Sequence, residues 1–218
     1  MQERSGALER TDLGPKGLRT ERSLKDAARR VFARDGYVNA KITDIAVEAG
    51  KSPASFYNYF QNKRQILEAL LDDFMEALND RTLLLTQPGT ARYESLRAAV
   101  QAFWQTYQDF LPELVGVTQA AAVDEDFMRV WLRVRELGVQ NIARAVAAAQ
   151  RNGRLPARLD AMMAASALSS MLEHSCYLWL GMGVATLGRP STDETAIETI
   201  ATLWYRALWS PDEAGAGD

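Results

Sequence analysis

Apolar residues recur every three or four positions along most of the chain, the spacing that gives an α-helix one apolar face. No segment of any length alternates strictly between apolar and polar residues, so the sequence offers no clear β-strand. The pattern therefore predicts an all-α protein of about nine helices. The expected helices cover residues 19–35, 41–49, 53–60, 62–86, 91–110, 112–123, 125–152, 158–182 and 192–209.

Glycines and capping residues mark the ends of these segments. The first expected helix stops at Gly36 and the second at Gly50, because glycine adopts the left-handed conformation that ends helices. Ser52 and Pro53 are typical of an N-cap and of the first helical position. Capping boxes need an Asn or Ser followed three residues later by a Gln or Glu. They are expected at Asn62 with Gln65 and at Ser191 with Glu194.

Charge divides the chain unevenly. Residues 1–65 carry 13 Lys and Arg against 8 Asp and Glu, whereas residues 66–218 carry 12 against 20. We expect a flexible arm over residues 1–18, a basic helical head over 19–65, an acidic helical body over 66–210 and a frayed tail over 211–218. A basic head suits a polyanionic partner, although a solvated charge run explains the same difference.

Composition excludes several classes of protein. Hydrophobic residues make up 47% of the 218 residues, which is enough for a substantial core. The most apolar stretch, residues 159–188, is interrupted by Asp160 and by Glu173-His174, so it predicts buried helix and no membrane span. The single cysteine, Cys176, cannot form an internal disulfide, and the N-terminus lacks the apolar run of a secretion signal. We expect a soluble, cytoplasmic protein with no membrane partner.

The most informative segment is residues 41–60, two short predicted helices joined by a tight turn at Gly50. Phe56 and Phe60 are four residues apart, so they share the inward face of the second helix. Ser55, Tyr57, Asn58 and Tyr59 then point largely outward. This is the helix-turn-helix pattern, whose second helix enters the DNA major groove. An ordinary helical hairpin with aromatic packing remains the alternative.

The stretch Lys25–Leu71 resembles the N-terminal domain of the TetR (tetracycline-repressor-like) family. The matching elements are Ala27-Ala28 to Phe32 with Gly36-Tyr37, Asp44-Ile45-Ala46 with Ala49-Gly50, and Ser55-Phe56-Tyr57-Asn58-Tyr59-Phe60 followed by Asn62-Lys63 and Leu67. The resemblance implies a DNA-binding transcriptional regulator, in the family usually a ligand-released repressor. It also implies a homodimer on a palindromic operator, and a body that binds an apolar or amphipathic small-molecule effector and forms the dimer.

The resemblance also implies which residues meet double-stranded DNA. The expected DNA-binding residues are Lys41, Thr43, Lys51, Ser52, Pro53, Ala54, Ser55, Tyr57, Asn58, Tyr59 and Lys63, with phosphate contacts from Lys51, Tyr57 and Lys63. Two positions depart from the family. Lys41 stands where the family often has Thr, and Ala54 stands where it commonly has Gly. Lys41 lacks the hydroxyl group that would cap the helix expected over residues 41–49, and Ala54 makes the helix expected over residues 53–60 stiffer than glycine would.

The body is rich in aromatic and methionine side chains, most of them expected in the core. The resemblance places a small-molecule pocket there. Its candidate lining residues are Trp104, Tyr107, Phe127, Trp131, Met163, Met171, His174 and Tyr177. Arg133 and Arg135 also allow the ligand to be acidic, but helical spacing cannot place both side chains inside the body.

No cofactor or metal is expected, and Asp124-Glu125-Asp126 is explained by a helix N-terminus. The alternative of a helical enzyme has only Glu173-His174 as a catalytic hint. A helical interaction module without a DNA role is a third hypothesis.

The last two expected helices are unusually apolar for the surface of a monomer. The final one carries more large apolar side chains than one packing face requires, which predicts a homodimer built on these two helices. The expected interface residues are Ile197, Ile200, Leu203, Trp204 and Leu208.

Overall fold

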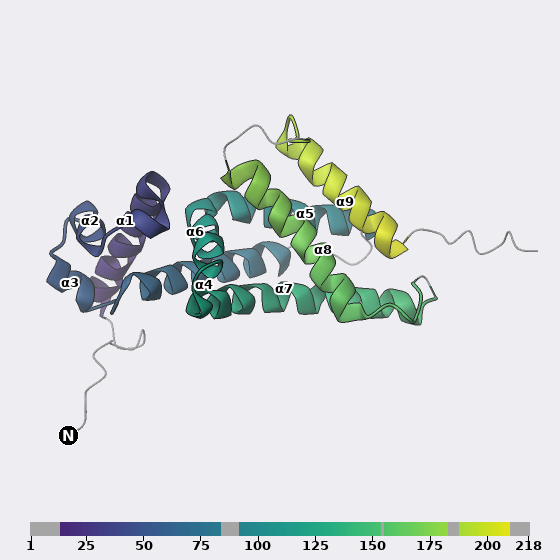
Figure 1. Cartoon of the computed structure of the whole chain (residues 1–218), viewed down its shortest axis with the longest axis horizontal. Helices are drawn as coiled ribbons and strands as arrows, with labels where there is room; N and C mark the ends of the chain where they lie inside the picture. The colour runs from purple at the N-terminus through teal and green to yellow at the C-terminus, as the bar shows by residue number, and fades with distance from the viewer. Residues whose placement is uncertain (1–13, 84–91, 154, 183–187, 210–218) are drawn as a thin grey trace, which may run out of the picture. The chain divides into compact units, whose positions relative to one another are not determined.

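The computed structural model describes residues 14–83, 92–153, 155–182 and 188–209, and every regular element within these ranges is a helix (Figure 1). The all-α prediction is therefore confirmed. The helices are α1 (Pro15–Asn39), α2 (Ile42–Glu48), α3 (Pro53–Tyr57), α4 (Lys63–Leu83), α5 (Arg92–Asp109), α6 (Leu111–Ala121), α7 (Glu125–Arg151), α8 (Ala161–Cys176), the π-helical turn η2 (Tyr177–Gly181) and α9 (Asp193–Trp209). Most of the expected arm and the expected tail lie outside the described residues.

Two helix boundaries differ from expectation in ways that matter for function. Helix α1 begins at Pro15 rather than near residue 19, because proline at the first helical position starts a helix without losing a hydrogen bond. Its helical geometry breaks at Gly36, which has a φ of 74°, as expected. Helix α3 ends at Tyr57 rather than at residue 60, and the backbone N–H groups of Tyr59 and Phe60 both bond the carbonyl of Phe56 in a closing turn.

The chain divides into two compact units. The first consists of the described residues up to Phe74 together with Phe110–Val130, and the second consists of Met75–Asp109 and Trp131 onwards. Helix α6 and the start of α7, which were expected in the body, therefore lie in the unit that contains α1–α3. The local reason is that α6 packs directly on α1.

The contact between α6 and α1 is unusually close. A Cβ added to Gly116 would lie 2.8 Å from the Cβ of Tyr37, so no larger residue fits there without movement. The Tyr37 ring is buried and lies edge-on to Phe32 and to Phe127, with centroids 5.3 Å apart in both pairs. Glu113, fully buried on α6, accepts a 2.8 Å bond from the Arg29 side chain of α1.

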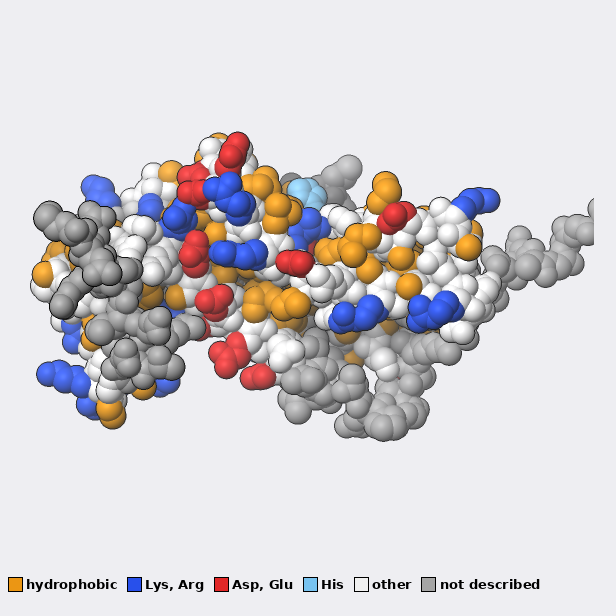
Figure 2. All heavy atoms as spheres, turned by 90° about the horizontal axis from the view of Figure 1, so that it is seen from below, with side chains coloured by type: hydrophobic (Ala, Val, Ile, Leu, Met, Phe, Trp, Pro, Cys, Tyr) orange, Lys and Arg blue, Asp and Glu red, His pale blue; other side chains and the backbone are white. Residues whose placement is uncertain are grey.

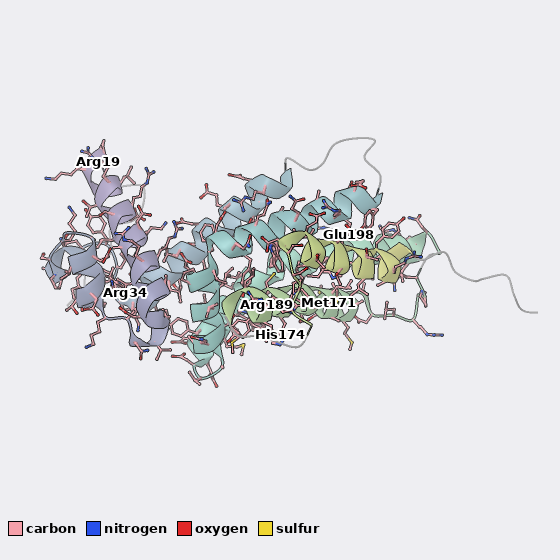
Figure 3. All side chains as sticks on the ribbon, turned by 90° about the horizontal axis from the view of Figure 1, so that it is seen from above. Arg19, Arg34, Met171, His174, Arg189 and Glu198 are labelled. Atoms are coloured by element: carbon pink, nitrogen blue, oxygen red, sulfur yellow. The ribbon has the colours of Figure 1, made fainter. Side chains whose placement is uncertain are left out.

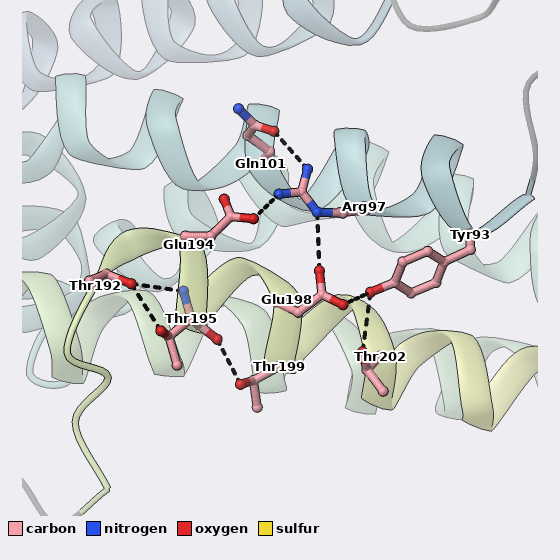
Figure 4. Close-up of polar contacts among 9 residues, drawn as sticks. All are labelled: Tyr93, Arg97, Gln101, Thr192, Glu194, Thr195, Glu198, Thr199 and Thr202. Carbon is pink, nitrogen blue, oxygen red and sulfur yellow. Dashed lines mark hydrogen bonds and ion pairs between the residues drawn. The ribbon is translucent and has the colours of Figure 1, made fainter.

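In the second unit, α9 is held on α5 by a polar seam (Figure 4). The Arg97 guanidinium of α5 binds Glu194 and, at 3.1 Å, Glu198 of α9. The Tyr93 hydroxyl also contacts Glu198. Thr192 caps α9 by accepting the Thr195 N–H at 3.1 Å, so the cap lies one residue after the expected Ser191.

Four of the five residues expected at a dimer interface are buried on α9. Ile197, Ile200, Trp204 and Leu208 are each at most 6% exposed. They form part of the core of their own chain, because α9 covers α5 with its apolar face. Of the five, only Leu203 is exposed, at 54%. None of the described helices combines the length and the hydropathy of a membrane-spanning segment.

Candidate nucleic-acid interface

Helices α2 and α3 form two short helices joined by a tight turn. The turn places Gly50 at a φ of 64°, and the N–H of Lys51 bonds the carbonyl of Ala46 at 2.8 Å. The Ser52 hydroxyl then accepts the N–H of Ser55 at 3.2 Å, as expected for an N-cap, and Pro53 opens α3. A left-handed residue followed by a capped proline turns the chain sharply and restarts the helix at once.

Helix α3 has only five residues, so packing must hold it in place. Phe56 is fully buried and Phe60 is 4% exposed, with ring centroids 5.7 Å apart. Ile45 and Ala46 of α2 are fully buried as well. The expected inward face of the motif is therefore confirmed, and it fixes which side chains α3 presents outward.

The outward side chains are mostly those expected to meet DNA. The exposed ones are Lys41, Thr43, Lys51, Ser52, Pro53, Ala54, Tyr57 and Asn58, and the half-buried ones are Ser55, Tyr59 and Lys63. Tyr57 is 52% exposed despite its size. Hydroxyl, amide and ammonium groups on a short protruding helix suit the base edges and phosphates of a major groove.

Lys63 has a structural contact that sequence reasoning missed. Its ammonium group donates to the carbonyls of Tyr37, Val38 and Ala40 at 2.6, 3.0 and 2.8 Å. It also lies 4.5 Å from the centre of the Tyr37 ring, and partial burial lowers the pKa of the ammonium group. These three carbonyls follow the break at Gly36, so Lys63 satisfies the end of α1. A phosphate contact from Lys63 stays a prediction that would compete with these bonds.

Comparison with known proteins identifies the motif. The family model described as bacterial regulatory proteins, tetR family, matches residues 24–70, which span α2, α3 and parts of α1 and α4. The chain is 27% identical over 170 residues to the HTH-type transcriptional regulator YdgC of Bacillus subtilis, covering 78% of this chain and 85% of that protein. The chain belongs to the TetR family.

Other TetR-family proteins resemble this one over much of their length. The HTH-type transcriptional repressor KstR2 of Rhodococcus jostii is 29% identical over 142 residues, covering 59% of this chain and 68% of that protein. The crystal structure of AibR in complex with isovaleryl coenzyme A and operator DNA aligns with a TM-score of 0.63 and 19% identity. That alignment covers 88% of this chain and all of AibR, and it shows a shared fold.

The structure does not gather all the expected ligand residues of this TetR-family regulator in one place. In the second unit Trp104 and Tyr107 are buried, while Trp131, Met171 and Tyr177 are half-buried. Met163 and His174 are exposed, and Phe127 belongs to the first unit beside Tyr37. Met171 and His174 both project from α8 (Figure 3). The chain's one histidine is visible on the surface in Figure 2.

Trp104 has an unusual feature for a core residue. It is 1% exposed, yet its indole N–H has no hydrogen-bond partner. Its ring lies 6.3 Å from that of Trp179, which stands in η2. Buried donors are normally paired, so an unpaired N–H in this interior is unusual. The indole N–H of Trp204 on α9 is likewise unpaired. Trp179 was not among the expected ligand residues, and only the π-helical turn marks it.

The structure settles which of two arginines points inward. Arg133 is exposed, whereas the Arg135 side chain is 13% exposed and lies 4.4 Å above the Trp131 ring. Arg135 donates to Glu173 at 2.5 Å and to Ser170 at 2.9 Å. Burial raises the pKa of Glu173, which also accepts a bond from Ser169. Sequence spacing allowed either arginine inside, and only the position of α8 decides.

The catalytic hint in Glu173-His174 finds no support in this geometry. The Glu173 carboxylate is held by Arg135 and Ser169, while His174 is exposed and stacks on Tyr177 with centroids 6.1 Å apart. In the part of the chain that the structure describes, no group of three or more His, Cys, Asp or Glu residues is arranged to hold a metal ion. The family to which the chain belongs consists of transcriptional regulators.

Proposed function

We propose that the protein is a ligand-released transcriptional repressor that acts in the cytoplasm as a homodimer on a palindromic operator. The observation that carries this proposal is the presentation of α3. The buried rings of Phe56 and Phe60 pack into the core of the first unit, while the side chains of Tyr57 and Asn58 are exposed to solvent. The repressor role is supported by the name of the relative KstR2, and operator binding by the complex reported for AibR.

A homodimer is proposed because one five-residue recognition helix reads few base pairs. Two such helices related by two-fold symmetry, about 34–36 Å apart, read the two half-sites of a palindrome. The described surfaces of α8 and α9 offer apolar side chains for the dimer. Met163 of α8 is 73% exposed and Leu203 of α9 is 54% exposed. These residues replace the buried set from α9 in the proposed interface.

The proposed effector is an apolar or amphipathic molecule that carries an acyl carbonyl or carboxylate. The second unit has an apolar aromatic interior with two unpartnered indole donors, at Trp104 and Trp204, and an inward guanidinium at Arg135 that Glu173 and Ser170 hold in place. AibR, which shares the fold, binds isovaleryl coenzyme A. An effector that favours the non-binding arrangement by about 3 kcal/mol would lower operator affinity by roughly two orders of magnitude.

Binding to the upstream region of the protein's own gene tests the DNA-binding part of the proposal. The wild type should shift this fragment in a gel, and Tyr57→Ala should weaken binding while helical content in circular dichroism stays unchanged. Leu137→Ala is the matched control, since Leu137 is 58% exposed on α7 in the second unit. Equal binding by wild type and Tyr57→Ala would show that α3 is not the recognition helix.

A thermal-shift screen tests the effector. Fatty-acyl, steroid-like and aromatic compounds should include some that raise the melting temperature, and these should release the DNA in the gel. By thermodynamic linkage, the operator must weaken effector binding by the same factor. A compound that stabilises the protein and leaves operator affinity unchanged would disprove the coupling between effector and DNA.

A further inference from the structure

We propose that Lys16 and Arg19, on the first two turns of α1, form a second DNA contact that binds backbone phosphates beside those reached by the helix-turn-helix. This inference rests on the proposed DNA-binding function and adds a surface that neither the family match at residues 24–70 nor the expected DNA residues include.

The early start of α1 creates this surface. Because the helix begins at Pro15, Lys16 stands on regular helix rather than in the expected flexible arm, and Arg19 stands about one turn further along that helix. Both side chains are exposed, and Arg19 projects from the N-terminal end of α1, far along the helix from Arg34 (Figure 3). Neither forms an ion pair with any residue in the described ranges.

The position of this surface follows from contacts lower on the same helix face. At 100° per residue, Lys16, Arg19, Ser23 and Arg30 fall within about 60° of one another around α1. Arg30 binds Glu48, near the end of α2, at 2.6 Å. The Ser23 hydroxyl binds the carbonyl of Ala49, the next residue, at 3.3 Å. This face of α1 therefore runs along the end of α2 toward the turn that begins α3.

Arg19 and Lys16 continue this face toward the N-terminal end of α1. At about 1.5 Å per residue, they stand roughly 6 and 10 Å beyond Ser23 along the helix axis. The next part of the motif in that direction is the turn Gly50–Ser52, which precedes α3. The proposal therefore places the two side chains on the side of the first unit that carries Lys51, one of the expected phosphate contacts.

Six other described cations of the first unit are bound to carboxylates, unlike Lys16 and Arg19. Lys25 and Arg29 bind Asp73, and Arg29 also binds Glu113. Arg30 and Arg34 share Glu48, and Arg64 and Arg129 bind Asp126. The described cations of this unit without a carboxylate partner are Lys16, Arg19, Arg22, Lys41, Lys51 and Lys63, of which Lys63 binds backbone carbonyls instead. Unneutralised cations beside a DNA-reading helix suit phosphates, which accept ammonium and guanidinium donors and release counterions.

The salt dependence of binding to a short duplex of mixed sequence tests the inference, because phosphate contacts do not depend on sequence. Anisotropy titrations between about 50 and 200 mM NaCl compare the wild type with K16Q/R19Q. Each lost phosphate contact removes about 0.9 from the slope of log K against log salt, so the double variant should lose about 1.8 per protomer. Arg151→Gln removes an exposed cation from the end of α7 in the second unit and should leave the slope unchanged.

The possible outcomes separate this inference from the proposed function. A folded K16Q/R19Q variant, verified by circular dichroism, that keeps the wild-type affinity and slope would overturn the second contact while leaving the helix-turn-helix function intact. A wild type that binds neither this duplex nor the upstream fragment would overturn both. A smaller slope for K16Q/R19Q with an unchanged slope for R151Q supports the contact and assigns it to α1.

Discussion

Two lysines of the first unit have the same charge and opposite surroundings. Lys51 is exposed at the turn before α3, whereas the Lys63 ammonium donates to three backbone carbonyls at the end of α1. Hydrogen bonds from charged donors to otherwise unpaired carbonyls contribute about 1.5–3 kcal/mol. Lys63 therefore stabilises the end of α1, whereas the exposed ammonium group of Lys51 remains accessible to DNA phosphates.

Replacing each lysine by methionine separates these roles. Lys63→Met should lower the free energy of unfolding by about 1–3 kcal/mol, because the carbonyls lose their donor. Lys51→Met should change stability by less than about 0.5 kcal/mol and reduce the salt slope of DNA binding by about 0.9. Urea denaturation and anisotropy measure the two effects. A Lys63→Met variant as stable as wild type would show that these bonds do not hold α1 in place.

Two helical glycines provide a second residue-scale comparison. Gly116→Ala places a Cβ 2.8 Å from the Cβ of Tyr37, a separation at which the neighbouring atoms must shift. We expect a loss of about 1–3 kcal/mol in the free energy of unfolding, as for other overpacked contacts. Gly138→Ala on α7 has no atom within 4 Å of the new Cβ and should gain about 0.5–1 kcal/mol from the better helix propensity of alanine. Equal effects in urea denaturation would show that the α1–α6 contact is looser than described.

At the scale of elements, the pairing of α6 with α1 depends on a buried charge. Glu113 is fully buried, one of its oxygens is unpartnered, and the other is held by Arg29. Arg29 also binds Asp73 of α4 at 3.4 Å, so one guanidinium links three helices of the first unit. Burying a carboxylate is costly even when it is paired, and burial raises the pKa of Glu113.

This raised pKa predicts a pH dependence of stability. The folded state keeps the Glu113 proton at pH values where the unfolded chain has lost it, so stability falls as pH rises from the ordinary pKa of 4.5 through the raised value. Glu113→Gln removes this titration. The free energy of unfolding of the variant minus that of the wild type should therefore increase from pH 4.5 to pH 7.5, and Glu94→Gln, at an exposed position of α5, should show no such change. A difference that is independent of pH would contradict the raised pKa.

At the scale of the whole molecule, the proposed dimer requires a surface that the chain does not bury itself. The apolar face of α9 covers α5, so the dimer depends on what remains outside, including Leu203. Leu203→Glu should convert the dimer to a monomer of 24.2 kDa in light scattering and weaken operator binding, since each monomer carries one recognition helix. Leu137→Glu, at a similarly exposed position on α7, is the control. A Leu203→Glu variant that keeps the dimer mass would place the interface elsewhere.

Sequence alone determined the helical class, most helix boundaries to within a few residues and the two faces of α3. These features depend on local chemistry: the periodicity of apolar residues, the cap at Ser52 and the left-handed glycines at 36 and 50. The family resemblance followed from the same short segment, and the match at residues 24–70 confirmed it.

Tertiary structure decided what each exposed or buried side chain meets. Sequence periodicity says that Ile197, Ile200 and Trp204 share a face, but not that α5 rather than a second chain covers it. Likewise, nothing in the sequence around Lys63 indicates that the carbonyls of residues 37, 38 and 40 lie within its reach. Such contacts join residues far apart in the sequence, and they exist only once the packing of helices brings them together.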